Sequence, residues 1–236
     1  MSLDHQSLGH HIKLLTIDLD DTLWPCFPTI TLAEQTLYDW LKINLPRITQ
    51  RYSLDDLRNK RKQLMQQQPN LQNDLSAARR AHFQQLADEF NYGHDWIEEG
   101  FTIFLHARQQ VTFYDDVLPV LSQLSLRFKM IALTNGNAHV NLVGLGDFFS
   151  TQFSAADVQA AKPDPAMFQR AMQFAGVTPQ QTLHVGDHAI HDIEGAKRAG
   201  VTAVWLNRHN EAWPYDSFVA DYEISSLYGL LELLAS

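Results

Sequence analysis

The pattern of apolar and polar residues divides the chain into three stretches. A short apolar run at residues 14–17 has the length of a buried strand. From Thr29 to about Arg108 the apolar residues recur at helical spacing, without a convincing strand. From Val111 onwards, short apolar runs alternate with helical patterns, which is typical of a parallel sheet. The chain therefore predicts an α/β core, residues 1–23 and 111–236, with a helical bundle inserted at residues 24–110 after the first strand.

Turn and cap residues set the expected boundaries of these elements. In the insertion, Ser53 and Asp56 resemble a capping box, and the prolines at 25 and 28 predict a linker leaving the sheet. Residues 1–10 lack periodicity and are expected to be frayed. In the core, Asp115 or Asp116 is expected to cap a helix. The expected strands are 129–133, one at Phe153, 182–185, 201–206 and 222–224, and the expected helices are 116–126, 138–144, 165–175, 190–199 and 227–234.

Composition and charge exclude several classes of function. The chain has 236 residues and a net charge of −9, which argues against a nucleic-acid binder. A basic run at residues 58–62 could bind phosphate, but a solvated helix face is favoured. Cys26 is the only cysteine, so no intrachain disulfide can form. Without a signal-peptide pattern or an apolar run of roughly 18 residues, we expect no membrane partner, a cytoplasmic location, and a monomer or homodimer.

Carboxylates end the first strand, and further polar residues fall at the other predicted strand ends. Asp18, Asp20 and Asp21 stand within four residues, and such a cluster needs a cation nearby. Ligands of open α/β sheets bind at the carboxyl ends of strands. At such ends or at helix starts stand Thr134, Asn135, Lys162, Asp187 and Asp192. These residue types suit phosphoryl transfer: a carboxylate nucleophile, a hard cation such as Mg²⁺, neutral donors, a lysine and a second carboxylic acid.

These motifs, in this order, resemble those of the haloacid dehalogenase-like hydrolases. Asp18-Leu19-Asp20-Asp21-Thr22, Leu133-Thr134-Asn135, Lys162-Pro163 and Gly186-Asp187 with Asp192 match the four motifs of that family. The resemblance implies a Rossmann-like core with a helical cap. It also implies that Asp18 is the nucleophile, Asp20 the general acid and base, and Lys162 a bridge between phosphate and nucleophile. Thr134 and Asn135 would bind phosphate, Asp18, Asp20 and Asp187 would bind Mg²⁺, and Asp192 would support Lys162 or metal-bound water.

The resemblance favours a phosphatase acting on a small-molecule phosphate monoester. Dehalogenases of the family usually lack the second aspartate, Asp20, and mutases typically have Glu-Asp in the fourth motif. The neighbours of the second and fourth motifs resemble those of bacterial phosphatases that act on flavin mononucleotide and on the phosphoribitylaminouracil of riboflavin synthesis. Another nucleotide or sugar phosphate, or a non-catalytic binding module, remains an alternative.

Two residues near the motifs have open roles in this interpretation. His188 stands where many relatives have a small or acidic residue, and it is either a surface histidine or a neighbour of metal or substrate. Trp24 follows Asp20 by four residues, so its ring either stacks on a planar substrate or wedges the cap against the core.

Overall fold

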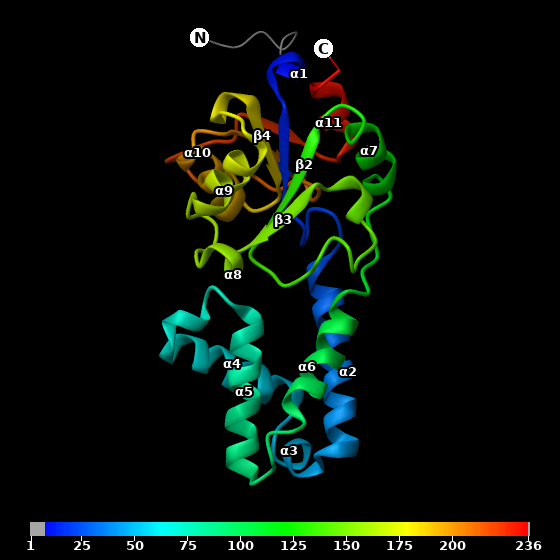
Figure 1. Ribbon diagram of the computed structural model, residues 1–236, viewed down its shortest axis with the longest axis vertical. Helices are drawn as coiled ribbons and strands as arrows, with labels where there is room; N and C mark the ends of the chain where they lie inside the picture. Colours follow the sequence, from blue (N-terminus) through cyan, green and yellow to red (C-terminus); the bar gives the residue numbers. More distant parts are fainter. Residues whose placement is uncertain (1–7, 236) are drawn as a thin grey trace. The chain divides into compact units, whose positions relative to one another are not determined.

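The computed structural model describes residues 8–235, which fall into two compact units (Figure 1). Among these residues the first unit, here called the α/β unit, comprises residues 8–25 and 112–235. The second, the helical unit, comprises residues 26–111.

A six-stranded sheet forms the centre of the α/β unit. Its strand order is β3-β2-β1-β4-β5-β6, and every neighbouring pair is parallel. The central strand β1 is buried along its whole length, as its uninterrupted apolar sequence requires. The strands are β1 (Leu14–Ile17), β2 (Lys129–Thr134), β3 (Thr151–Ser154), β4 (Thr182–Gly186), β5 (Thr202–Leu206) and β6 (Tyr222–Ile224). The expected α/β fold with a parallel sheet is confirmed.

Helices cover the sheet on both faces, with α9 and α10 on one side and α7 and α11 on the other (Figure 1). Phe168 of α9 and Ile193 pack with Leu14 and Ile131 of the strands in one apolar core. The helices are α1 (Leu8–His11), α7 (Val117–Leu124), α8 (Ala155–Val158), α9 (Ala166–Ala175), α10 (Gly195–Arg198) and α11 (Tyr228–Leu233). Shorter turns are η3 (Gly146–Phe148), η4 (Pro179–Gln181) and the wide π-helical turn η5 (Ala189–Glu194).

Two expectations about where this unit is helical and where it is frayed are wrong. Residues 138–144 form turns instead of a helix, because the Gln152 side chain binds the backbone N–H of Val140 and the carbonyl of Ala138, at 2.9 and 2.7 Å. These tertiary hydrogen bonds replace those that a helix would make. In the amino-terminal segment, Leu8 is buried in α1, so residues 8–10 are not frayed; the expectation for residues 1–7 lies outside the described part of the chain.

The helical unit consists of helices and one short turn. They are α2 (Cys26–Asn44), α3 (Pro46–Arg51), α4 (Leu54–Gln67), η2 (Pro69–Leu71), α5 (Leu75–Phe90) and α6 (Ile97–Arg108). The capping box of Ser53 and Asp56 at the start of α4 is confirmed. The linker expected at residues 24–28 is wrong in its second half, because α2 already begins at Cys26. Pro28 is tolerated there, since the N–H groups of a first helical turn have no partner within the helix.

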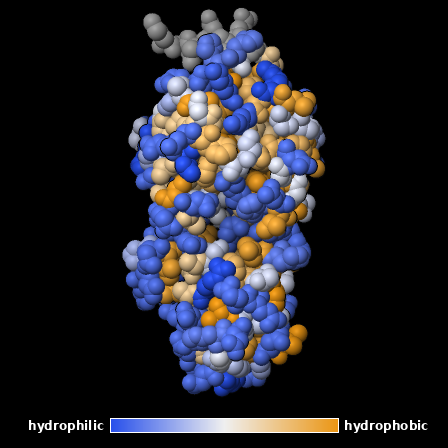
Figure 2. All heavy atoms as spheres, viewed as in Figure 1, coloured by the Kyte–Doolittle hydropathy of each residue, from blue (hydrophilic) through white to orange (hydrophobic). Residues whose placement is uncertain are grey.

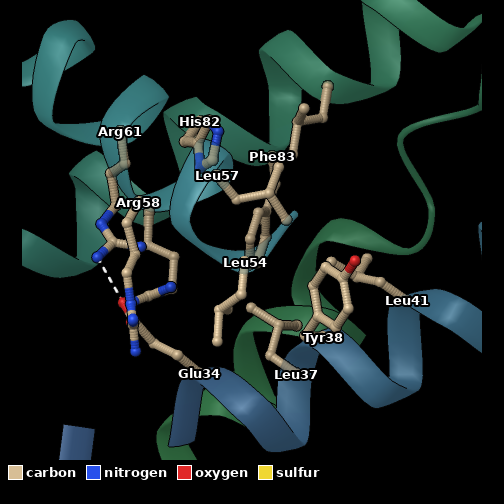
Figure 3. Close-up of a pocket in the computed structure, with 12 residues that line it drawn as sticks. Glu34, Leu37, Tyr38, Leu41, Leu54, Leu57, Arg58, Arg61, His82 and Phe83 are labelled. Carbon is tan, nitrogen blue, oxygen red and sulfur yellow. Dashed lines mark hydrogen bonds and ion pairs between the residues drawn. The ribbon is translucent and has the colours of Figure 1, made fainter. Parts of the chain in front are cut away.

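The basic run of α4 binds a buried carboxylate and is not a purely solvated face. Glu34 of α2 is 2% exposed and pairs with Arg58, with Arg61 at 2.6 Å and with Arg79 at 3.3 Å (Figure 3). Burial raises the pKa of Glu34, but Arg61 and Arg58 outweigh that effect and lower it. This cluster joins α2, α4 and α5. Separating these helices would leave a buried charge without its partner, which is costly.

His82 of α5 lines a small pocket beside this cluster (Figure 3). Its side chain is 2% exposed, and neither ring nitrogen has a hydrogen-bond partner among the described residues. Burial lowers the pKa of His82 to about 3, and Arg61 and Arg79 contribute to that shift. The folded chain therefore keeps this imidazole neutral at pH values where the unfolded chain protonates it.

We expect His82 to make the protein less stable as the pH falls. The unfolded state takes up a proton near pH 6.5 and the folded state only near pH 3. The contribution of His82 to the free energy of unfolding should therefore be complete above pH 6.5 and lower by roughly 3 kcal/mol at pH 4. Urea unfolding at pH 7, 6, 5 and 4 should show a shallower pH dependence for His82→Leu than for wild type. His106→Leu, which changes an exposed histidine whose ring contacts the uncharged Gln110, should retain the wild-type dependence. Parallel pH curves for wild type and His82→Leu would contradict the assignment.

The surface in view is mainly polar (Figure 2). Exposed apolar side chains include Phe27, Ile43, Leu126 and Val219, which belong to separate parts of the chain. Within residues 8–235 no helix has the length and apolar character that crossing a membrane would need.

Candidate active site

One pocket of the α/β unit gathers the side chains that end its central strands. Its volume is about 140 Å³, and it lies where β1, β2 and β4 end. All seven candidate residues line it: Asp18 and Asp20 after β1, Thr134 and Asn135 at the end of β2, Lys162 before α9, Asp187 after β4 and Asp192 in η5. Asp21, Gly136, His188 and His191 complete the lining. These residues lie together because the carboxyl ends of parallel strands are at the same edge of the sheet.

Lys162 is the centre of a buried ion cluster in this pocket. Its Nζ lies 2.5 Å from Asp18 Oδ1 and 2.6 Å from Asp192 Oδ1, and it also donates to the Leu133 carbonyl at 2.8 Å. Burial would lower the pKa of Lys162, but Asp18 and Asp192 raise it above its usual value. Burial also raises the pKa of Asp18, and Lys162 offsets that effect only in part. The ammonium group therefore stays charged and is saturated with acceptors.

Asn135 holds the segment that carries Lys162. Its side-chain amide donates to the Lys162 carbonyl at 3.0 Å and accepts the Lys162 backbone N–H at 2.8 Å. Both ends of this side chain are thus used in positioning the lysine, so the side chain of Asn135 supports the phosphate site through Lys162. The neighbouring Thr134 hydroxyl accepts the Gly136 N–H at 2.9 Å, so its own proton remains available for donation.

Asp192 anchors the lysine from the opposite side. Its Oδ1 accepts from Lys162 and from His184 Nε2 at 3.2 Å, and its Oδ2 accepts the His188 N–H at 3.0 Å. Burial raises the pKa of Asp192, but Lys162 and the hydrogen bond from His184 outweigh it and hold the pKa well below its usual range. A Cβ on Gly186 would lie 2.5 Å from Asp192 Oδ2, so only glycine fits there.

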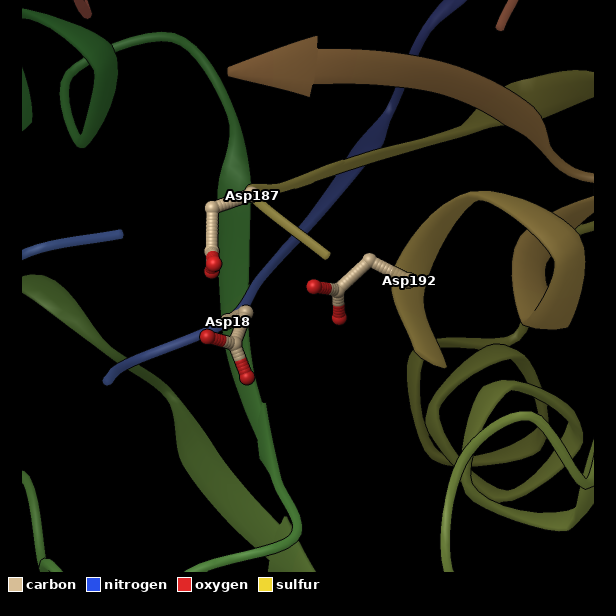
Figure 4. Close-up of side chains that lie close together, drawn as sticks. All are labelled: Asp18, Asp187 and Asp192. Atoms are coloured by element: carbon tan, nitrogen blue, oxygen red, sulfur yellow. The ribbon is translucent and has the colours of Figure 1, made fainter. Parts of the chain in front are cut away.

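Three carboxylates in the pocket could hold a divalent cation. One oxygen from each of Asp18, Asp187 and Asp192 lies within 4.8 Å of the others (Figure 4). Burial and the Asp192 charge raise the pKa of Asp187 to about 7, which shows that the protein alone does not compensate this carboxylate. Oxygen-only donors and excess negative charge fit a hard cation such as Mg²⁺. Because Asp192 already accepts three hydrogen bonds, Asp18 and Asp187 are the better direct ligands.

Asp187 is held in place by two residues that the sequence pattern did not indicate as site residues. Thr22 Oγ1 donates to Asp187 Oδ1 at 3.0 Å, and Trp205 Nε1 donates to the Asp187 carbonyl at 2.7 Å. Arg208 in turn donates to the Thr22 carbonyl at 2.9 Å and forms two hydrogen bonds with Asp116. The Asp116 side chain therefore does not cap α7 as expected.

The loop after β1 presents Asp20 to the pocket. Asp21 adopts a left-handed conformation with φ of 60°, and its N–H donates to the Trp24 carbonyl at 2.8 Å. Trp24 Nε1 donates to Asp20 Oδ1 at 2.9 Å, and the indole is fully buried beside Phe113. The idea that this ring stacks on a substrate is therefore wrong, because a buried indole offers no face. Trp24 instead orients Asp20.

Comparison with known proteins identifies relatives over nearly the whole chain. The model of the haloacid dehalogenase-like hydrolases matches residues 12–200. The 5-amino-6-(5-phospho-D-ribitylamino)uracil phosphatase YigB of Escherichia coli is 28% identical over 98% of this chain and 99% of its own. A glyceraldehyde 3-phosphate phosphatase of Pyrococcus furiosus is 27% identical over 94% of this chain and 93% of its own.

Solved structures agree with this relationship. The crystal structure of a protein named 2-haloacid dehalogenase, from Pseudomonas syringae, is 39% identical, with a TM-score of 0.89 over 95% of this chain and 98% of its own. A phosphatase of the same family from Thermococcus onnurineus is 29% identical, with a TM-score of 0.67 over 94% and 98%. The match of a family model to most of the chain, added to the four motifs gathered in one pocket, shows that this protein belongs to the haloacid dehalogenase-like hydrolases.

Proposed function

We propose that the protein is a Mg²⁺-dependent phosphatase that hydrolyses a small-molecule phosphate monoester through a phosphorylated Asp18. The observation that carries the proposal is the pairing of two aspartates with different surroundings in one pocket. Asp18 is buried and lies 2.5 Å from Lys162, whereas Asp20 is partly exposed and held by Trp24. Such a difference in environment suits a nucleophile and a proton donor.

The chain's own residues can divide the reaction into two displacements. Asp18 attacks phosphorus while the ester P–O bond breaks, and Asp20 protonates the departing alcohol oxygen. Asp20 then takes a proton from the water that cleaves the acyl phosphate and releases phosphate. Lys162 and the Thr134 hydroxyl stabilise the negative charge of the transferred group. Mg²⁺, held by Asp18, Asp187 and the Asp20 backbone carbonyl, would supply charge neutralisation and orientation.

Asp20 also separates a phosphatase from a dehalogenase, the activity for which the Pseudomonas syringae protein is named. A departing halide needs no proton, so a dehalogenase would have no use for a carboxylic acid at the Asp20 position. The curated relatives include phosphatases for phosphoribitylaminouracil, glyceraldehyde 3-phosphate and phosphoserine. We therefore expect the protein to release phosphate from phosphate monoesters and to release no halide from 2-chloropropionate.

For the substrate, we propose flavin mononucleotide or the phosphoribitylaminouracil of riboflavin synthesis. Support comes from the full-length match to the Escherichia coli enzyme that has the second substrate in its name. A panel of phosphorylated metabolites ranked by kcat/KM tests this choice, and a higher rank for hexose phosphates would reject it.

We further propose that the helical unit is a cap, because water must be excluded from an acyl phosphate. We also propose that this cap sets the selectivity for the substrate.

Removal of the metal should abolish hydrolysis. With p-nitrophenyl phosphate, wild type should release phosphate in Mg²⁺ and lose at least about a hundredfold in EDTA, because the excess carboxylate charge repels the phosphate. Asp187→Ala should raise the Mg²⁺ concentration needed for half-maximal activity, since a hard oxygen ligand is lost. Asp147→Ala, an exposed position in η3, is the matched control. Full wild-type activity in EDTA would reject the metal requirement.

A further inference from the structure

We propose that His188 and His191 form a subsite that recognises hydroxyl groups of the alcohol part of the substrate. The inference rests on the proposed phosphatase function. It concerns the part of the pocket that contacts the alcohol leaving group. Both histidines line the pocket, and both are exposed. Neither contributes to the ion cluster around Lys162 through its side chain.

The two imidazoles form one rigid surface. Their rings are stacked, with centroids 3.9 Å apart and planes inclined by 13°. The wide turn η5 brings them together, and irregular turns of this kind often accompany functional sites. Because each ring restricts the other, little side-chain entropy is lost when a ligand contacts them.

Backbone contacts determine which nitrogen of His188 can bind a ligand. Its Nδ1 accepts the N–H groups of Ile190 and His191, at 3.2 and 3.1 Å. A ring nitrogen that accepts carries no proton, so the proton of the neutral ring is on Nε2. His188 therefore offers an N–H donor at the outer edge of its ring. Hydroxyl oxygens of an alcohol next to the ester bond are suitable acceptors.

The charges of the pocket restrict the alcohol further. Among the described residues that line it, five are aspartates and one is a lysine. The lysine is already bound to Asp18 and Asp192, so a carboxylate on the leaving group finds no unpaired lysine or arginine side chain among these lining residues. The His188 N–H donor suits an uncharged hydroxyl acceptor, and the five carboxylates repel an anionic one. We therefore assign the substrate class as phosphate monoesters of uncharged polyhydroxy alcohols.

The test compares ribitol 5-phosphate, 2-phosphoglycolate and p-nitrophenyl phosphate in the full-length enzyme with Mg²⁺. Wild type should favour ribitol 5-phosphate over 2-phosphoglycolate by at least about tenfold in kcat/KM. His188→Asn keeps an oxygen that caps the turn but removes the ring, and His191→Leu removes the second ring. Each should reduce kcat/KM for ribitol 5-phosphate, mainly through KM, about tenfold more than for p-nitrophenyl phosphate. His10→Asn, at an exposed position of α1 before the opposite end of β1, is the matched control.

The outcomes separate this inference from the proposed function. Absence of phosphate release from all three compounds by wild type would reject the phosphatase itself. Equal losses on all three substrates in both histidine variants, at unchanged melting temperature, would reject the subsite and leave the phosphatase. A wild-type preference for 2-phosphoglycolate would reject the assigned substrate class. An increased Mg²⁺ requirement with equal losses would place the histidines with the metal and also overturn the inference.

Discussion

Asp18→Asn should abolish turnover while the protein stays folded. The amide is nearly the same size as the carboxylate and can still accept the hydrogen bond from Lys162, but it cannot form an acyl phosphate. We expect the hydrolysis rate of p-nitrophenyl phosphate to fall at least about a thousandfold, equivalent to roughly 4 kcal/mol in the barrier. The melting temperature should change by only a few degrees, because Lys162 retains its contact with Asp192.

Chemical trapping makes this test specific. Borohydride reduction of the wild-type enzyme during turnover should convert residue 18 to homoserine, which mass spectrometry of the peptide detects. Asp147→Asn, an exposed aspartate of the same unit, should show wild-type rates and the same trapped product. If Asp18→Asn stays within about tenfold of wild type, or the trapped residue is another one, Asp18 is not the nucleophile.

The sheet could be predicted because its strands are short apolar runs with clear ends. The run at residues 14–17 coincides with β1, and the ends of β2 and β4 fall at the polar residues that define the pocket. Residues 138–144 could not be assigned in the same way. Their spacing suits a helix, but the Gln152 side chain binds the local backbone from β3. A long-range contact of this kind leaves no local signal in the sequence.

The candidate residues could be named from sequence, but their partners could not. The motif spacing indicates Asp18, Lys162 and Asp192, whereas His184 looks like an ordinary polar residue within a strand. Its hydrogen bond to Asp192 depends on the register of β1 and β4, which places His184 opposite Thr16 and within hydrogen-bond distance of Asp192. Arg208 likewise lies 186 positions from the Thr22 carbonyl that it binds. Such pairs follow from strand order, which a single sequence does not specify.

The burial of Lys162 has a second consequence, for stability rather than catalysis. Its side chain is 1% exposed and neutralises Asp18 and Asp192, whose side chains are 10% and 2% exposed. Lys162→Met keeps the length of the side chain but leaves two carboxylates close together without a cation. We expect a loss of about 3–5 kcal/mol in the free energy of unfolding, measured in EDTA so that metal does not compensate. Activity should be lost as well.

The pH dependence distinguishes lost charge compensation from lost packing. Without Lys162, the folded-state pKa of Asp192 should rise above its unfolded value, and the pKa of Asp18, which burial already raises, should rise further. The variant should therefore lose stability as the pH increases. Its deficit relative to wild type should therefore be largest near pH 8 and shrink towards pH 5. Lys197→Met removes an ammonium group from a pair with Asp221 at 2.7 Å whose side chains are 33% and 38% exposed, and it should cost less than about 1 kcal/mol at either pH. A deficit of Lys162→Met that is the same at pH 5 and pH 8 would show that the lysine matters through its hydrocarbon chain, and it would remove the electrostatic explanation for its burial.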